Sequence, residues 1–210
     1  MLKKLLIQGF TASIPSDIID HMNIFVVNQD PVIAAQELCD KHVVKMILES
    51  AQMLSTAHRL LDGEMYTELN TRSNRRVKRW RLDDERDNIM YKVVHINHPC
   101  TVWTRECSAN YKWHYRHFVA LCDEFTHRYS KVHSTDKLLR GPLAELPNNI
   151  VHTKVMTKMP MAMFDECKIS SDPVECYRNY YQTKQTRFNM SWTNRQVPKW
   201  FRFYDEEYVL

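Results

Sequence analysis

Aromatic and apolar residues recur at helical spacing along residues 111–129. Steps of three or four positions separate Tyr111, Tyr115, Phe118, Cys122, Phe125 and Tyr129. At 3.6 residues per turn these side chains share one face, and such a stripe is most often buried in a core. We therefore predict a long helix here. The polar residues expected to face solvent from its other side are Arg116, His117, Asp123, Glu124 and Arg128.

Glycine is scarce, with three in 210 residues. This scarcity argues against a turn-rich β protein and against glycine loops that bind phosphate. Hydrophobic residues make up 44% of the chain, enough for a globular core. Prolines exclude long helices between residues 130 and 171. We predict an all-α fold, a compact single domain of about three main helices with irregular loops and a short extended N-terminal arm.

Residues 1–21 differ in character from the rest of the chain. An apolar run, residues 22–27, begins at Met22 and suits a short strand or an extended arm. We interpret residues 1–21 as an N-terminal extension, with the native start either at Met1 or at Met22, and residues 22–210 as one helical domain. The apolar run at Met1 is too short for a signal peptide and no segment is long enough to span a membrane, so we expect a cytoplasmic protein.

Helix start and stop signals frame two other segments. Asp30 suits an N-cap and Pro31 the first helical position, and helical periodicity then continues to about residue 61, in one piece or two. Gly63 suits the end of that run. Asp172 and Pro173 repeat the start signal before a final helix.

Three polar side chains that can share protons lie on one stripe of the helix predicted before Gly63. His42, Lys45 and Glu49 fall within it, with Gln52 beside them. The alternative is an exposed face on which Lys45 and Glu49 form a surface ion pair worth a few tenths of a kcal/mol. The residues expected to form the apolar face roughly opposite are Val44, Ile47, Leu48 and Ala51.

Two segments combine cations with aromatic residues, as surfaces that bind nucleic acid do. Residues 72–81 hold six cations and one tryptophan, and they form either a solvated basic loop or a phosphate-contacting arm. Residues 197–204 either pin the chain end to the core or provide a stacking platform for bases. The candidate DNA contacts are Gln52, Arg75, Arg76, Lys78, Arg79, Trp80, Lys199, Trp200, Phe201 and Arg202.

Six cysteines are scattered along the chain with no CxxC pair. The histidines and cysteines lack the spacing of metal ligands. We expect reduced and mostly buried thiols, no metal site and no cofactor.

Two segments resemble the opposite ends of the pyrimidine-dimer DNA glycosylases of the phage endonuclease V type. That family carries a Leu-x-Asp-x-His pattern with its essential glutamate seven residues after the histidine, which Leu38, Asp40, His42 and Glu49 match. It also ends in a Pro-x-Trp-aromatic-cation-aromatic-Tyr segment, which residues 198–204 match. Residues 39–59 further resemble a group of phage proteins with a CDKHVVKM-type signature, which favours a phage origin.

The resemblance implies covalent chemistry on DNA. Such enzymes flip a nucleotide and attack its sugar C1′ with a neutral amine, and the glutamate stabilises the sugar cation and then assists β-elimination. The family uses its terminal α-amine, whose unperturbed pKa is about 7.7–8.0. Here Asn23 would supply it if the chain began at Met22 and lost that residue, and Lys45 is the substitute if Met1 is the start. Leu48 and Gln52 stand where the family has arginines.

Glu49 is thus the predicted catalytic carboxylate, and His42 would contact phosphate or tune Glu49. The leading hypothesis is a base-excising DNA glycosylase with an abasic-site lyase step, acting as a monomer on double-stranded DNA in the cytoplasm of a phage-infected host. Two alternatives stay open. One is a phage transferase that modifies DNA bases in the same pocket, and the other is a non-enzymatic DNA-binding or host-takeover protein.

Overall fold

The computed structural model describes residues 23–204. The α-helices and strands within them are, in order, α1 (Pro31–Glu37), α2 (Asp40–Asp62), β1 (Glu64–Asn70), β2 (Arg75–Arg81), α3 (Arg86–Ile89), α4 (Pro99–Glu106), α5 (Ser108–Tyr129), α6 (Ser134–Leu139) and α7 (Pro173–Gln182). Short 3-10 turns lie at Pro142–Ala144, Asp165–Cys167 and Thr183–Thr186. The predicted extension of residues 1–21, and Met22 with it, lies outside the described residues.

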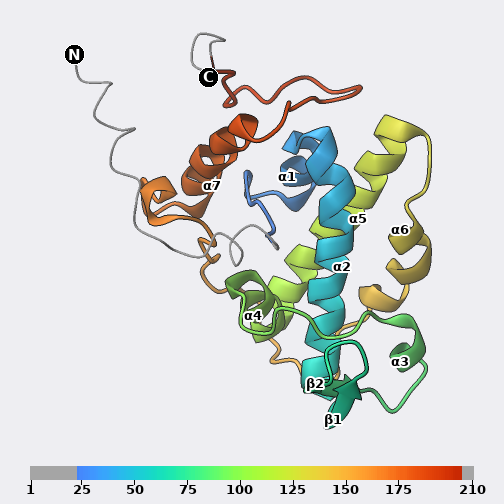
Figure 1. Cartoon of the computed structure of the whole chain (residues 1–210). Coiled ribbons are helices and arrows are strands. Elements are labelled where there is room, and N and C mark those ends of the chain that lie inside the picture. The colour runs from blue at the N-terminus through green and yellow to red at the C-terminus, as the bar shows by residue number, and fades with distance from the viewer. Residues whose placement is uncertain (1–22, 205–210) are drawn as a thin grey trace.

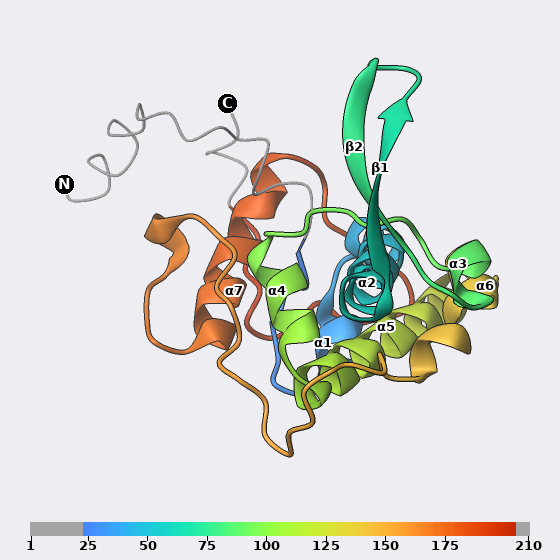
Figure 2. The same ribbon diagram turned by 90° about the horizontal axis from the view of Figure 1, so that it is seen from below.

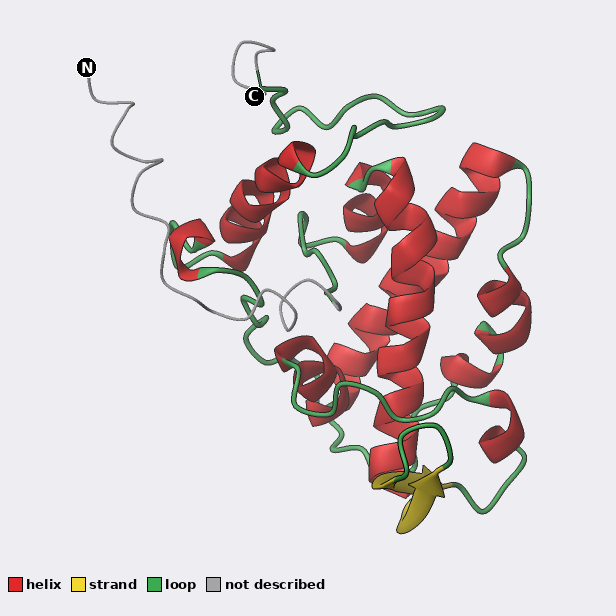
Figure 3. Ribbon diagram, in the orientation of Figure 1, coloured by secondary structure: helices red, strands yellow, loops and turns green. Residues whose placement is uncertain are grey.

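The long helices α2 and α5 run antiparallel through the middle of the molecule, as the colours of Figure 1 show. α1 packs on α5, and α4 packs on both long helices. Helices dominate the described chain (Figure 3), so the predicted helical class is confirmed, although seven α-helices replace the three main ones expected. None of the helices within residues 23–204 is long and apolar enough to cross a membrane.

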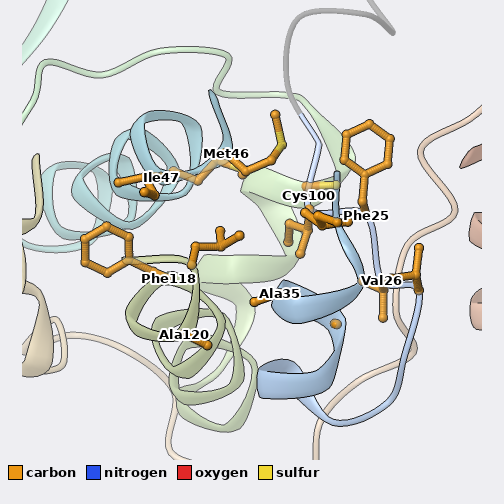
Figure 4. Packing of buried hydrophobic residues seen from close by; sticks show 14 of the residues in the cluster. Phe25, Val26, Ala35, Met46, Ile47, Cys100, Phe118 and Ala120 are labelled. Carbon is orange, nitrogen blue, oxygen red and sulfur yellow. The ribbon is translucent and has the colours of Figure 1, made fainter. Parts of the chain in front are cut away.

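One hydrophobic core joins both ends of the described chain. Figure 4 shows Ile47 of α2 on the side of Phe118 from α5, Met46 extending toward Cys100 of α4, and Phe25 of the N-terminal arm beside Cys100. The N-terminal arm, residues 23–27, is buried and pairs with no strand within residues 23–204, and its chain turns at Phe25, where φ is 52°. All six cysteines are buried free thiols, as predicted.

The helix boundaries follow the local signals. The Asp30 carboxylate accepts hydrogen bonds from the backbone N–H groups of Val32 and Ile33, and Pro31 takes the first position of α1. Asp172 caps α7 in the same way. Gly63 ends α2 because a Cβ at this position would lie 2.5 Å from the carbonyl oxygen of Arg59.

The β-hairpin is the main departure from the all-α prediction. Residues 72–81 were expected to form a loop or an arm, but they include strand β2, which pairs antiparallel with β1. Two asparagines make the turn without glycine. The Asn70 side chain accepts from the backbone N–H groups of Arg72 and Ser73, and Asn74 adopts the left-handed conformation at φ 51°. The low glycine count therefore did not exclude a hairpin.

A buried arginine fixes the base of the hairpin to α2. Arg59 is fully buried, and its guanidinium donates to the carbonyl oxygens of Trp80, Asp87, Met90 and Tyr91 and to the Asp87 carboxylate. These acceptors belong to β2, to α3 and to the segment after α3. One side chain therefore holds three consecutive pieces of chain against the C-terminal end of α2.

We expect Arg59→Leu to lower the free energy of unfolding by about 3–5 kcal/mol, because it removes a buried guanidinium and leaves four carbonyl groups and the half-buried Asp87 carboxylate without this donor. Urea denaturation followed by circular dichroism measures the loss. Arg79→Leu is the matched control, since Arg79 pairs with the exposed Glu68 and such pairs contribute about 0–1 kcal/mol. Equal losses in the two variants would contradict the role given to Arg59.

Candidate active site

Glu49 lies on α2 with its carboxylate turned toward the N-terminal arm. Its Oε2 atom accepts a hydrogen bond from the backbone nitrogen of Asn23 at 3.2 Å, and its Oε1 atom lies 3.0 Å from Nζ of Lys45. Glu49 is 5% exposed, whereas the Lys45 side chain is 49% exposed. The buried carboxylate therefore lies between the N-terminal arm and the half-exposed amine of Lys45.

The surroundings of Asn23 hold its backbone nitrogen in place. The side-chain oxygen of Asn23 accepts from the backbone N–H groups of Ile24 and Phe25, and its amide nitrogen donates to the carbonyl oxygen of Ala162 at 2.8 Å. Cys100 approaches the same side chain, with Sγ 3.9 Å from Oδ1. Burial raises the pKa of this thiol to about 12, so it stays protonated near neutral pH.

His42 packs against the N-terminal arm. Its ring stacks on Phe25 with centroids 4.7 Å apart, and its Nδ1 atom lies 2.7 Å from the hydroxyl of Tyr181 on α7. Burial, together with the charges of Lys184 and Lys45, lowers the pKa of His42 to about 3. The imidazole is therefore neutral near pH 7 and is buried away from the surface that a phosphate could reach.

Phe25, which rests on His42, has φ 52°. This left-handed conformation is costly for a bulky residue, by about 1–3 kcal/mol, and persists only where the surroundings enforce it. Here Phe25 is packed between His42, Tyr180 and Tyr181. The strain therefore lies two residues from the nitrogen that contacts Glu49.

Asp40, the third residue of the matched motif, is part of the scaffold. Its carboxylate accepts from Arg128 of α5 and from Ser191 and Thr193 of the C-terminal segment. Burial acts to raise the pKa of Asp40, but the hydrogen bonds from Thr193, Ser191 and Arg128 outweigh it and lower that pKa. Arg128 and Arg195 also hold the buried Glu124, so this network ties the C-terminal segment to α2 and α5.

The family model of the pyrimidine dimer DNA glycosylases matches residues 22–138, from the residue before Asn23 to the end of α6. The chain belongs to this family. The match covers the arm, Glu49 and the stripe of α2, and it supports the resemblance recognised in the motifs. No curated protein and no solved structure matches the chain.

For this glycosylase family member, the outward face of α2 differs from the predicted one. Ile47 and Ala51 are buried as expected, but Val44 and Leu48 are 38% and 40% exposed. The N-terminal arm and α7 cover the side of α2 that holds His42 and Glu49. The exposed face of α2 is therefore the one that carries Lys45. The Lys45–Glu49 ion pair of the alternative interpretation forms, but Glu49 is buried rather than exposed, and only Ile47 and Ala51 of the predicted apolar face are buried. Gln52 is half-buried on the same helix.

The predicted contacts of residues 72–81 lie on β2, far from the C-terminal candidates. Arg75, Arg76 and Lys78 are exposed, while Arg79 pairs with Glu68 and Trp80 is half-buried. Figure 1 shows the hairpin at one end of α2 and the C-terminal segment beyond its other end. Glu49 lies on the helix between them.

Of the two roles considered for residues 197–204, the contacts favour the structural one, in which the segment packs against the core. Phe201 is 3% exposed and packs on Trp192 at 4.9 Å, so it is not available to stack on a base. Trp200 is half-buried beside Tyr181, with Arg178 over its ring. The aromatic rings that remain exposed are those of Phe203 and Tyr204, and the cations are Lys199 and Arg202.

Several side chains of the site escaped the sequence analysis. Tyr177 and Tyr181 of α7 were not among the predicted site residues, yet they contact Cys100 and His42. Lys184 is a buried cation whose Nζ donates to the hydroxyl of Tyr180 and lies 5.7 Å from the Phe25 ring. Nothing in the spacing of these residues relates them to Glu49, because they lie more than 100 positions away in sequence.

Proposed function

We propose that the protein excises a base from DNA and then cleaves the abasic strand, with Glu49 as the catalytic carboxylate and the nitrogen of Asn23 as the nucleophile. The observation that carries the proposal is the 3.2 Å contact between this nitrogen and the Glu49 carboxylate. In a chain whose first residue is Asn23, that nitrogen is an α-amine. The family to which the chain belongs supports the same substrate class.

The placement of these two groups accounts for each step of the reaction. The neutral amine attacks C1′ of the sugar, the glycosidic bond breaks, and the base leaves with the bonding electrons and takes up a proton. The attached nitrogen gives up a proton, and the C1′–O4′ bond then breaks as O4′ takes up a proton, which opens the sugar ring and leaves an iminium between the nitrogen and C1′. The carboxylate of Glu49 stabilises the positive charge that develops on the sugar and on the resulting iminium. Proton removal from C2′ then expels the 3′-phosphate and breaks the strand, and Glu49 lies next to the iminium nitrogen and can assist.

The remaining residues of the site act on this pair. His42 and Phe25 position the arm, and Lys45 balances the charge of Glu49 from the solvent side. Lys45 is the less suitable nucleophile because its side chain is 49% exposed and points to the solvent side of Glu49, whereas the nitrogen of Asn23 is buried beside the carboxylate. Cations of the hairpin and of the C-terminal segment flank the site and suit DNA phosphates. A phage origin, on the signature of residues 39–59, would place the DNA in an infected host cell.

Borohydride trapping on duplex DNA with an abasic site tests the nucleophile. We expect a covalent adduct from a chain that begins at Asn23, because its α-amine is free, and about 10²-fold less from the chain that begins at Met1, where the same nitrogen is an amide. Denaturing electrophoresis measures the adduct. Mass spectrometry of the protein from its native source identifies the first residue.

Two controls complete the test. Acetylation of the Asn23 amine should abolish trapping, and Lys45→Arg in the chain beginning at Asn23 should preserve it. Trapping by the chain beginning at Met1 that is lost with Lys45→Arg would transfer the role to Lys45. DNA binding without an adduct in either chain would overturn the proposal and favour a binding protein or a base-modifying transferase.

A further inference from the structure

The two faces of the hairpin differ in charge. In the observed register Arg76 lies opposite Leu69 and Lys78 opposite Thr67, and Trp80 lies opposite Met65, so these six side chains share one face. We call it the acid-free face, since it carries two cations and no carboxylate. The paired face holds the other cross-strand pairs, formed by Glu64, Tyr66, Glu68, Asn70, Arg75, Val77, Arg79 and Arg81.

On the paired face much of the cationic charge is already engaged. Arg79 forms an ion pair with Glu68 at 2.6 Å, and Arg81 lies over the Tyr66 ring at 5.0 Å. Three arginines share this face with two glutamates. The acid-free face instead leaves Met65 and Leu69 49% and 58% exposed beside its cations. A face that combines exposed apolar side chains with cations, and that itself carries no carboxylate, suits contact with a nucleic acid.

The hairpin extends from the helical body as a two-stranded ribbon (Figure 2). Its strands have seven residues each, or about 23 Å at 3.3 Å per residue. The major groove of B-form DNA, about 12 Å wide, admits a ribbon of this kind. Most residues of both strands are exposed, and the half-buried Trp80 lies where the base of the ribbon meets the rest of the protein.

The base of the hairpin is fixed relative to Glu49. Arg59 ties β2 to α2, and Thr56 of α2 exchanges hydrogen bonds with the backbone of Val94. A cavity of about 480 Å³ lies between the acid-free residues Lys78 and Trp80 and the segment of residues 93–99. From Glu49 to the end of α2 is about 20 Å at 1.5 Å per residue, which equals about six base pairs.

We propose that the acid-free face of the hairpin enters the major groove of duplex DNA about six base pairs from the nucleotide at Glu49. This inference rests on the proposed function for the identity of the partner. Arg76 and Lys78 contact the phosphates and base edges that line the groove, and Met65 and Leu69 contact its apolar groups. The hairpin then increases the length of duplex that the protein contacts on one side of the site.

Binding of the full chain to an uncleaved duplex, followed by fluorescence anisotropy over a range of salt concentrations, tests the proposal on the Glu49→Gln background. We expect Arg76→Gln with Lys78→Gln to weaken binding about tenfold or more near 0.15 M salt and to reduce the salt slope by about two. The matched variant, Arg75→Gln with Arg81→Gln, removes the same charge from the paired face and should lose no more than about threefold.

Flank length provides a second measurement. Affinity should rise when the duplex is lengthened beyond about six base pairs on one side of the abasic site, and not on the other. The acid-free variant should lose this gain, and methyl green, which occupies the major groove, should compete. Equal losses from the two faces, or equal affinity for single-stranded DNA, would overturn the proposal. Adduct trapping is independent of these outcomes, so the failure of either proposal can be recognised separately.

Discussion

Glu49→Gln should reduce strand cleavage and borohydride trapping by about 10²–10⁴-fold, the range expected when a charge-stabilising and proton-transferring group is lost. Glutamine keeps the size of the side chain and an oxygen that can accept from the Asn23 nitrogen. It removes the negative charge that stabilises the sugar cation. Single-turnover cleavage of a duplex with a damaged pyrimidine or an abasic site measures the loss, in the chain that begins at Asn23.

Lys45→Gln is the matched control, since it removes the partner of the ion pair but keeps the carboxylate. We expect at most about a tenfold loss, and the affinity for DNA and the circular dichroism spectrum of Glu49→Gln should remain those of the unmodified protein. An equal or larger loss in Lys45→Gln would show that the amine, rather than the carboxylate, is the essential group of the pair. Wild-type cleavage by Glu49→Gln would remove the basis of the proposed mechanism.

Acid should unfold the protein cooperatively, because several histidines are buried in their neutral form. Burial lowers the pKa of His117 to about 3 and that of His114 well below its ordinary value. Burial and nearby cations lower the pKa of His42 to about 3 and that of His58 to about 4. In the unfolded chain each titrates near pH 6.5. The unfolded state therefore binds more protons than the folded state below that pH.

The stability that depends on these neutral histidines decreases in acid. It is complete above about pH 6.5 and is lost as the pH falls, at about 1.4 kcal/mol per histidine per pH unit. A domain of ordinary stability, about 5–15 kcal/mol, should then unfold with a midpoint between about pH 4 and 5.5. Urea denaturation at a series of pH values measures the slope of the unfolding free energy.

His117→Phe isolates one of these groups. Neither ring nitrogen of His117 has a hydrogen-bond partner within the described residues, and the ring stacks on Trp113 at 5.4 Å, so phenylalanine preserves the contact. Between pH 6 and 5, the change in unfolding free energy per pH unit should become smaller by about 1.4 kcal/mol, which corresponds to the uptake of one proton fewer on unfolding. An unchanged slope would mean that His117 does not contribute to the acid transition.

Local signals were sufficient for the helix boundaries. Asp30 with Pro31, and Asp172 with Pro173, act on backbone groups within three positions, so their effect can be predicted from short stretches of sequence. The stripe of the 111–129 helix was also informative, since Tyr111, Phe118 and Cys122 are buried. A helical period also places Glu49 on one stripe with His42 and Lys45, but the catalytic role of its carboxylate was predicted from the resemblance to the glycosylase family.

Tertiary contacts decided the rest. His117, Glu124 and Arg128 were expected to face solvent but are buried. For Glu124 and Arg128 the reason is that Arg195 and Asp40 supply their partners from distant parts of the chain. The contact of Asn23 with Ala162, and that of His42 with Tyr181, span 139 positions each. No periodicity or spacing carries information over that range, so the closure of the site could not be predicted.

The long-range hydrogen bonds of Asn23 and His42 also limit where the chain can be truncated without losing contacts of the site. The region that identifies the family ends at residue 138, yet Ala162, Tyr177 and Tyr181 complete the wall around Asn23, Cys100 and His42. A fragment cut at residue 138 would lack the acceptor that holds Asn23 and the hydroxyl that holds His42. The stretch by which the family is recognised is therefore shorter than the stretch of chain that encloses the site.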